Sequence, residues 1–425
     1  MTSRLAIGFV LFATLALPWG ARAEEAKSFE NLPQLVETAL TNNPELKASE
    51  AQWEMFRNRV VQAGALEDPM LMLKLQNFLI RDPLNSGRDP MSQRVIGISQ
   101  QLPFWGKRDL KTEVAKQEAE ALKWQVEERK LELARMVKET YYQIFMTDKD
   151  LEIIGKNIRI MDDFIALAET KYSVGQGAQQ DVFKAQTERS KMLSMKITLE
   201  QQRRTLQATL NTLLFRPAET PVGSIADFEL KPLAWSPEQL RDMAGENRPL
   251  LKSVRARIEG GKAGHRLAEK EFFPDVNVSF EYMQRDPAMA DPGYDMYALG
   301  FTFNLPVQRA RRHAMVRDSS AGIAMAEAEL NTVNNAINLG IADNLARMEQ
   351  REKLAGLFKT GIIPQAEQSL ESATIGYRVS KVDFLTLLDN RLTLYNLERE
   401  YYESLAEYQM RLAQLEALVG KELQE

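Results

Sequence analysis

The stretch from Val276 to Tyr282 reads Val-Asn-Val-Ser-Phe-Glu-Tyr, and Tyr297 to Leu305 reads Tyr-Ala-Leu-Gly-Phe-Thr-Phe-Asn-Leu. In both stretches every second residue is a large aliphatic or aromatic one, and the residues between them are small or polar. A period of two is that of a β-strand, whose side chains point alternately to opposite faces. Segments of about ten residues are long enough for a tilted strand to cross a bilayer. We therefore expect the large side chains to face lipid and the others to face a lumen.

Two segments nearer the N-terminus have the same character. Leu71, Leu73 and Leu75 alternate with more polar neighbours, and Ile96 and Ile98 are flanked by Gly97 and Ser99. The loops 79–92 and 285–295 are rich in Asp, Arg, Asn, Gly and Pro, as expected at a water-exposed rim. The alternative is a pair of amphipathic hairpins packed on a soluble core.

Four strands cannot close a barrel, and an open sheet edge in lipid leaves backbone groups without partners. The chain must therefore oligomerise. Two copies give about 8 strands and three give about 12, both within the known range of barrels. A channel for large solutes favours the larger number, because barrel diameter grows with strand number.

The chain is also a tandem duplication, which is visible as four dipeptide or tripeptide landmarks that recur about 200 residues later. The pairs are Asn43-Pro44 with Arg248-Pro249, Asp68-Pro69 with Phe273-Pro274, Leu102-Pro103 with Leu305-Pro306, and Tyr172-Ser173-Val174 with Tyr377-Arg378-Val379. We place the first copy at residues 24–216 and the second at 236–425. The proline-rich segment 217–235 between them is expected to be an ordered linker, since proline cannot continue a helix.

Each copy is expected to contain a helix, two strands, a long helix, a turn and another helix. The first helices are predicted over 32–66 and 237–271. Apolar residues recur every seven positions along 137–172 and 387–415, with others interleaved, as in the a/d seam of a coiled coil. A helix over 107–172 would be roughly 100 Å long at 1.5 Å per residue. The fold class is thus mainly α, with long coiled-coil hairpins and four strands for a transmembrane β-barrel.

The turns between the long helices differ in sequence. The first contains Gly175, Gln176 and Gly177, and the second has Ser380, Lys381 and Val382 at the same positions. Glycine readily adopts the positive φ that often ends a helix, so the second turn is predicted to have a different shape. Pro364 predicts a kink in the second long helix that the first copy lacks.

The N-terminus resembles a secretory leader. Arg4 precedes 13 residues that are mostly apolar, and Ala21-Arg22-Ala23 supplies a small-residue cleavage site, so residues 1–23 are predicted to be a signal peptide. The remaining chain has 52 basic and 59 acidic residues, a formal charge of −7 that argues against nucleic acid as a partner. With a mean hydropathy of −0.35, a polytopic helical membrane protein is not expected.

No pattern indicates an enzyme, a cofactor or a metal site. The chain has no cysteine and two histidines, His265 and His313, and it lacks a phosphate-binding glycine loop or a nucleophile elbow. Methionines near the strands could serve a Cu(I) relay, although methionine is also an ordinary apolar filler. Arginines 309, 311, 312 and 317 surround His313 and could bind anionic headgroups at the membrane boundary, or could be a solvated helix start.

The whole of the expected mature chain resembles the TolC family of outer-membrane efflux channels. The resemblance lies in the paired landmarks, in Leu-Pro-Phe-Trp-Gly-Lys-Arg at 102–108, in the Tyr-x-Val-Gly-x5-Asp-Val run at 172–182, and in the duplication. It implies a homotrimer in outer-membrane lipid, with a 12-stranded barrel continued by a helical tunnel in the periplasm. It further implies a passive exit duct for an inner-membrane pump, of the resistance-nodulation-division type that heavy-metal and cation exporters use, joined through a periplasmic adaptor.

The resemblance also implies a periplasmic gate beside the helical turns. Residues carried over are Tyr377, Asp389 and Asp181, while Thr386 stands where the family usually has another aspartate. Asp383 or Lys381 could substitute for what is missing, and Arg378 or Lys381 could offset repulsion within a ring of carboxylates. Helical spacing places Asp383, Thr386 and Asn390 on one polar face, with Asp389 alongside. A solvated helix end without a gating role is the alternative.

Two other functions share these features. A soluble periplasmic coiled-coil adaptor or scaffold would have the long helices but no need for strands with an apolar face. A duct for type I protein secretion would have the same fold. The sequence leaves the cargo open, whether metal cation, drug or protein.

Overall fold

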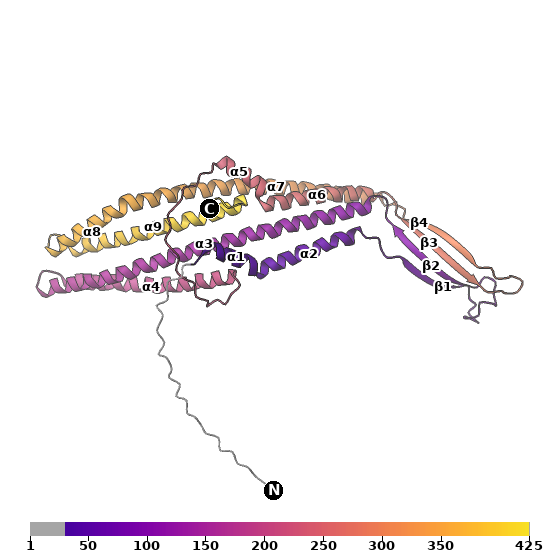
Figure 1. The fold of residues 1–425 in the computed structure, drawn as a ribbon, viewed down its shortest axis with the longest axis horizontal. Coiled ribbons are helices and arrows are strands. Elements are labelled where there is room, and N and C mark those ends of the chain that lie inside the picture. The colour runs from indigo at the N-terminus through magenta and orange to yellow at the C-terminus, as the bar shows by residue number, and fades with distance from the viewer. Residues whose placement is uncertain (1–29, 425) are drawn as a thin grey trace, which may run out of the picture.

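The computed structural model describes residues 30–424, so the expected leader lies outside the described residues. The molecule is elongated, with a four-stranded sheet at one end and helices along the rest of its length (Figure 1). The elements of the first copy are α1 (Leu32–Asn42), α2 (Pro44–Gly64), β1 (Met70–Gln76), β2 (Gln93–Leu102), α3 (Lys107–Ser173) and α4 (Gln179–Leu213). Those of the second are α5 (Pro237–Asn247), α6 (Pro249–Lys270), β3 (Val276–Arg285), β4 (Met296–Phe303), α7 (Arg309–Leu357), the π-turn η1 (Phe358–Ile362), α8 (Ile363–Arg378) and α9 (Phe384–Val419).

The strands form one antiparallel sheet in the order β1-β2-β3-β4. The register aligns the large residues across all four strands, in rows such as Leu71, Ile98, Phe280 and Leu299. Each member of that row is at least 45% exposed in the single chain. The neighbouring row on the opposite face is Met72, Gly97, Glu281 and Ala298. The predicted alternation is confirmed, and it gives the sheet one continuous apolar face.

The prediction of one unbroken helix at the start of each copy is wrong. Asn43 and Arg248 have ψ angles of 123° and 116°, which end α1 and α5 and separate them from α2 and α6. Each of these two residues precedes a proline, whose ring disfavours the helical conformation of the residue before it. The Asn43 side chain then caps α2 by accepting hydrogen bonds from the backbone N–H groups of Glu45 and Leu46, at 2.9 and 3.2 Å.

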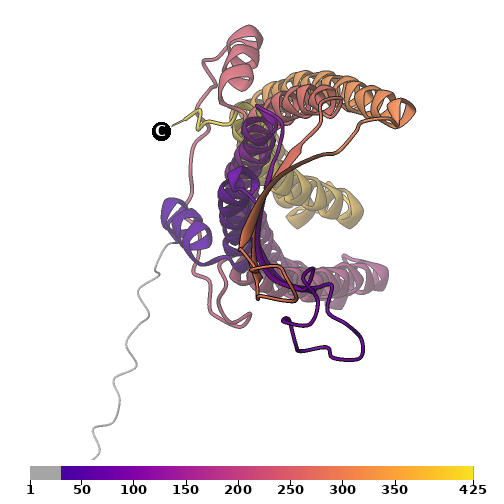
Figure 2. The same cartoon turned by 90° about the vertical axis from the view of Figure 1, so that its right-hand side faces the viewer.

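The long helices pack side by side as a curved layer. Helix α3 has 67 residues, which at 1.5 Å per residue is about 100 Å, as the heptad pattern predicted. It packs against α2 and α6 toward the sheet and against α4 and α9 toward the other end. Viewed along its length, the layer is an arc, and α1 and α5 lie on its convex side (Figure 2). No helix within residues 30–424 is long and apolar enough to cross a membrane.

The buried positions of α3 recur in the second copy at a constant spacing that changes once. The pairs Leu133 and Ile337, Val137 and Ile341, and Ile144 and Met348 are each 204 residues apart, whereas Ala168 and Ala373 are 205 apart. The second copy therefore holds one extra residue in this stretch. The π-turn η1 lies between the two sets and is followed at once by Pro364 in α8. The interruption expected from Pro364 thus takes the form of a π-turn, which accommodates one additional residue.

The segment 217–235 joins two apolar clusters at the middle of the molecule. Val222 and Ile225 are buried in a cluster with α1, α3 and α4. A few residues later, Leu230 and Leu233 pack against a second cluster, formed by α5, α7 and α9. The segment therefore ties the two copies together across the convex side of the arc (Figure 2).

Candidate gate at the helical tips

The two turns between long helices lie together at the end of the molecule farthest from the sheet (Figure 1). The Lys171 Nζ atom, near the end of α3, donates a hydrogen bond of 2.7 Å to Ser380 Oγ in the α8–α9 turn. Although this lysine is only 6% exposed, no sequence pattern singled it out. The turns of the two copies are thus linked within one chain.

The two turns have the same backbone shape, so the prediction that they differ is wrong. Gly175 and Ser380 both have positive φ, 73° and 58°, at equivalent positions. Each turn is closed by the same pair of hydrogen bonds. In one bond of each pair, a backbone N–H donates to the carbonyl oxygen five residues earlier. The donor and acceptor are Gln176 and Lys171 in the first turn and Lys381 and Gly376 in the second, both at 2.8 Å. Serine tolerates this conformation at a steric cost, which the hydrogen-bonded frame of the turn offsets.

Inside each turn a small residue packs against a large one, and the two turns place the large residue on opposite sides, one in the helix and the other in the loop. A Cβ atom on Gly177 would lie 3.1 Å from the Lys171 Cβ, so in the first turn the small residue is in the loop and the large one in the helix. In the second turn Gly376 is in the helix, and a Cβ there would lie 2.6 Å from a methyl of Val382 in the loop. Exchanging the small and large residues keeps the backbone the same.

Tyr377 is at the centre of the tip and is 4% exposed. Its ring meets Phe384 of α9 edge-on, with centroids 5.6 Å apart, and the Lys171 ammonium lies 5.1 Å from its centroid. Its hydroxyl has no hydrogen-bond partner among the described residues. Burial raises the pKa of this hydroxyl, and the nearby negative charge of Asp181, in the first turn of α4, raises it further. Tyr377 therefore joins α3, α8 and α9 and leaves one buried donor unused.

Asp383 is the N-cap of α9. Its carboxylate accepts a 2.7 Å hydrogen bond from the Thr386 backbone N–H, and this bond together with the Thr386 side chain holds the pKa of the carboxyl below its usual value. Two of the predicted gate residues are thus paired with each other at the helix start. Their arrangement explains why α9 begins where it does.

The other predicted polar groups point outward. Asp389, Arg378 and Lys381 are exposed, and none of them forms an ion pair within residues 30–424. Asn390, on the same helix face, accepts a 2.6 Å hydrogen bond from Ser369 of α8. The single chain therefore brings Tyr377, Asp383 and Thr386 into the tip, while Asp389, Arg378 and Lys381 remain available to groups outside it.

A buried charged pair lies in α9, between the tip and the middle of the molecule, and was not predicted from the sequence. Arg391 is 3% exposed, donates a 2.7 Å hydrogen bond from Nε to Asn157 Oδ1, and lies 3.7 Å from Glu398. Burial lowers the pKa of the guanidinium. Glu398 and Arg391 continue the seven-residue spacing of Leu412 and Leu405 toward the N-terminus of α9, so they occupy positions of the apolar seam. Charges at two consecutive seam positions were the signal that could have identified this pair.

Residues 30–424 hold no group of three or more His, Asp or Glu side chains arranged for a metal ion. The two histidines lie apart from the tip, close to the sheet. His265 Nδ1 is 2.9 Å from Ser319 Oγ, and the His313 ring packs against Phe272 with centroids 5.1 Å apart. Both are accounted for by local packing.

Known proteins match this chain over nearly its whole described length. The family model described as outer membrane efflux protein matches residues 35–214 and 240–421. The pyoverdine export outer membrane protein OpmQ of Pseudomonas aeruginosa is 25% identical, covering 92% of this chain and 83% of its own. The cobalt-zinc-cadmium resistance protein CzcC of Cupriavidus metallidurans is 22% identical, covering 92% and 90%.

Solved structures show the same fold. The outer membrane protein VceC of Vibrio cholerae superposes with a TM-score of 0.78 at 19% identity, covering 92% of this chain and 97% of that one. Since the family model covers well over half of the sequence, this chain belongs to the outer membrane efflux protein family and is an outer-membrane exit duct whose helices extend into the periplasm.

Proposed function

We propose that three copies of this chain form one duct, with a 12-stranded barrel in the outer membrane and a helical tunnel below it. The observation that carries this proposal is the open sheet with one apolar face. Within the described residues β1 and β4 are edge strands, and backbone groups at an edge need partners in lipid. Edge-to-edge pairing with neighbouring copies supplies them. The curved helical layer would close in the same way, with its concave side toward the lumen (Figure 2).

The barrel has a direct test in two neighbouring residues of β4. Phe301 lies on the apolar face opposite Val278, and Thr302 lies on the other face opposite Asn277. Phe301→Lys should destabilise the barrel by roughly 2 to 4 kcal/mol near the bilayer midplane, whereas Thr302→Lys should be tolerated better. Light scattering of the detergent-purified wild type should give a trimer. A monomer would contradict the shared barrel, and equal effects of the two substitutions would contradict the assignment of the faces.

The partners follow from the role of an exit duct. A passive channel needs an energy source, which we assign to an inner-membrane pump of the resistance-nodulation-division type, joined to the helical tips by a periplasmic adaptor. The names of two relatives give different cargoes, pyoverdine for OpmQ and cobalt, zinc and cadmium for CzcC, at similar identity to this chain. The cargo is accordingly expected to be selected by the pump. Co-purification of the duct with the adaptor and pump encoded beside it tests this assignment, and a type I secretion partner would replace it.

The tips are the proposed periplasmic gate. Threefold symmetry would place Asp389 from each copy around the axis, where a ring of carboxylates attracts cations and repels anions. The exposed Arg378 and Lys381 are close to Asp389 in sequence. In the trimer they could balance the negative charge of an Asp389 carboxylate from a neighbouring chain. The buried Tyr377 hydroxyl, unused within the chain, could find its partner only when the tips move or meet.

Planar-bilayer recordings test the gate. Asp389→Ala should lower cation selectivity and weaken block by multivalent cations. Tyr377→Phe keeps the ring contacts and removes only the hydroxyl, and it should raise the resting conductance. If both variants stay trimeric and both properties remain at the wild-type level, the constriction lies elsewhere.

A further inference from the structure

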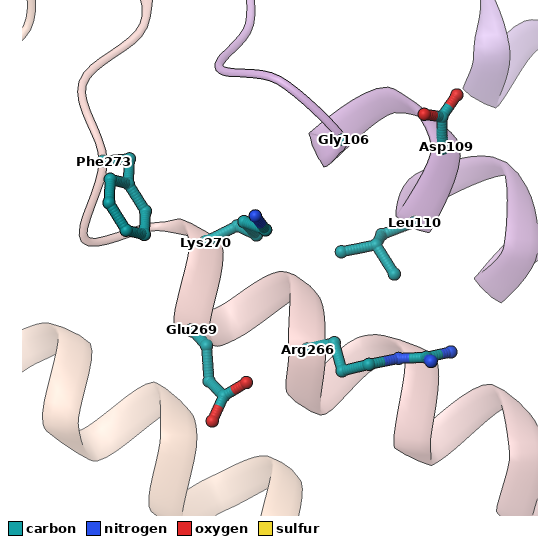
Figure 3. Close-up of a pocket in the computed structure, with 7 residues that line it drawn as sticks. All are labelled: Gly106, Asp109, Leu110, Arg266, Glu269, Lys270 and Phe273. Atoms are coloured by element: carbon teal, nitrogen blue, oxygen red, sulfur yellow. The ribbon is translucent and has the colours of Figure 1, made fainter.

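A pocket of about 550 Å³ opens between the start of α3 and the end of α6, where the strands give way to helices (Figure 3). Helix α3 contributes Asp109 and Leu110, and Gly106 is the residue just before it. Helix α6 contributes Arg266 and Lys270, and the chain after it contributes Phe273. The proposed duct and its gate make no use of this pocket.

The pocket combines an aromatic platform with two positive charges. The rings of Phe104 and Phe273 are stacked, with centroids 4.5 Å apart, and the Lys270 ammonium lies 5.6 and 5.7 Å from the two centroids. Neither Lys270 nor Arg266 forms an ion pair within the described chain. Cations without carboxylate partners beside apolar surface suit a ligand that is anionic at one end and apolar at the other.

The two carboxylates of the pocket are directed away from its centre. Glu269 points to the side of α6 that faces α7, where it is 3.7 Å from His265. Asp109 points to the opposite side, away from α6, while Lys270 points into the gap between the helices (Figure 3). The charge that points into the gap between the two helices is therefore that of the Lys270 ammonium.

Heptad spacing shows which side of the arc the pocket faces. Gly106, the residue before α3, is five heptads before Tyr141, and Asp109 is four heptads before Val137, which is buried in one cluster with α1. Residues a whole number of heptads apart lie on the same face of a coiled-coil helix. Tyr141 donates a hydrogen bond to the Glu30 carbonyl, just before α1, and α1 lies on the convex side (Figure 2). The pocket therefore opens on the outside of the arc.

The surroundings match a membrane boundary. Strand β2 ends at Leu102 and β3 begins at Val276, so the pocket lies within a few residues of the apolar face. Trp105, between β2 and α3, is 88% exposed, and indole rings gather at membrane–water interfaces. At the same level, Arg309 and Arg311 at the start of α7 are exposed and have no carboxylate partner in the described chain.

The geometry points to a binding site for an anionic glycerophospholipid of the periplasmic leaflet. Lys270 and Arg266 bind the phosphate, and the stacked rings with Leu110 cover the glycerol and the first acyl carbons. The inference rests on the outer-membrane placement of the sheet and goes beyond the conduction pathway. A lipid held here fixes the depth at which the helices leave the membrane.

The test measures lipid binding by native mass spectrometry of the detergent-purified assembly with added phosphatidylglycerol or phosphatidylcholine. Wild type is expected to bind phosphatidylglycerol about tenfold more tightly. The double variant Arg266→Ala/Lys270→Ala should lose that preference, because each basic residue near a membrane surface adds to the affinity for anionic lipid. The control Arg257→Ala/Lys262→Ala removes two charges from the same helix that are already paired with Glu329 and Glu259, and it should keep the preference.

Three outcomes would overturn the site: no preference in wild type, a preference that survives in the Arg266/Lys270 variant, or displacement of the lipid by millimolar inorganic phosphate, which would indicate a free-anion site. If the alanine variant fails to assemble, Arg266→Lys/Lys270→Arg keeps the charges and should keep the preference. Light scattering of the same samples separates the two proposals. Intact trimers without lipid preference overturn only this site, whereas monomers overturn the proposed duct.

Discussion

The α3–α4 and α8–α9 turns share one backbone but are held in place differently. In the first turn Tyr172 is 48% exposed and Ala178 gives α4 no side-chain cap. In the second, the equivalent tyrosine, Tyr377, is 4% exposed and Asp383 caps α9. The shape of a turn and its anchorage are thus separate properties. The second tip is fastened to the body of the molecule, and the first has fewer side-chain attachments, so we expect the first tip to move more readily.

The largest expected difference concerns the two tyrosines. Tyr377→Ala removes a buried ring that contacts Phe384 and Lys171, and it should destabilise the second tip by about 3 kcal/mol. Tyr172→Ala removes a half-exposed ring and should have an effect within about 0.5 kcal/mol. Hydrogen exchange of the amides beside each substituted tyrosine, in α8 and α9 for Tyr377→Ala and in α3 and α4 for Tyr172→Ala, would detect this. Equal acceleration in both variants would show that the two tips are anchored alike.

The packing of a small residue against a large one in the second turn can be disrupted by one substitution and restored by another. Gly376→Ala forces a Cβ against Val382 and should destabilise the second turn by about 1 to 3 kcal/mol. Adding Val382→Gly should restore much of the loss, since it copies the arrangement of the first turn. Exchange rates of the amides at 376–384 measure both steps. A double variant no better than the single one would refute steric compensation as the reason that the turns match.

The caps give a third and smaller difference. Ala178→Ser should stabilise the start of α4 by about 1 kcal/mol, because it adds the cap that α9 already has. Asp383→Ala should speed exchange at the start of α9 at neutral pH. The pKa of the Asp383 carboxyl is lowered in the folded protein, so its stabilising effect is present at neutral pH and is lost as the pH falls through that lowered pKa. Below it, wild type and Asp383→Ala should exchange at the same rate, and a persisting gap would contradict capping by the carboxylate.

The smallest effect is expected for Ser380→Gly, at a residue with positive φ. Ser380→Gly relieves the left-handed strain but removes the hydrogen bond from Lys171, so the two changes should nearly cancel. Gly175→Ser introduces the strain without a new partner and should cost about 1 kcal/mol. Thermal melts of the two variants compare them directly. A large loss for Ser380→Gly would mean that the link from Lys171 dominates at the second turn.

Most of the fold could be predicted from periodicity, because a period of two and a heptad repeat depend only on neighbouring residues. The break after Asn43 was also within reach, since its successor is a proline. The shape of the second turn was not, because the space left by Gly376 is filled by Val382, six residues away in a loop. The contacts of the exposed Asp389 could not be predicted either, because the groups that would face it belong to neighbouring copies.

The π-turn at Phe358–Ile362 has a consequence for the proposed gate. One extra residue in a regular α-helix rotates everything beyond it by about 100°. If η1 did not absorb that residue, Tyr377 would leave its place between α3 and α9, and the second tip would present a different face to the axis of the proposed trimer. The π-turn therefore keeps the helix in register beyond it. The two halves of the chain can differ in length by one residue while their tips still meet in the same orientation.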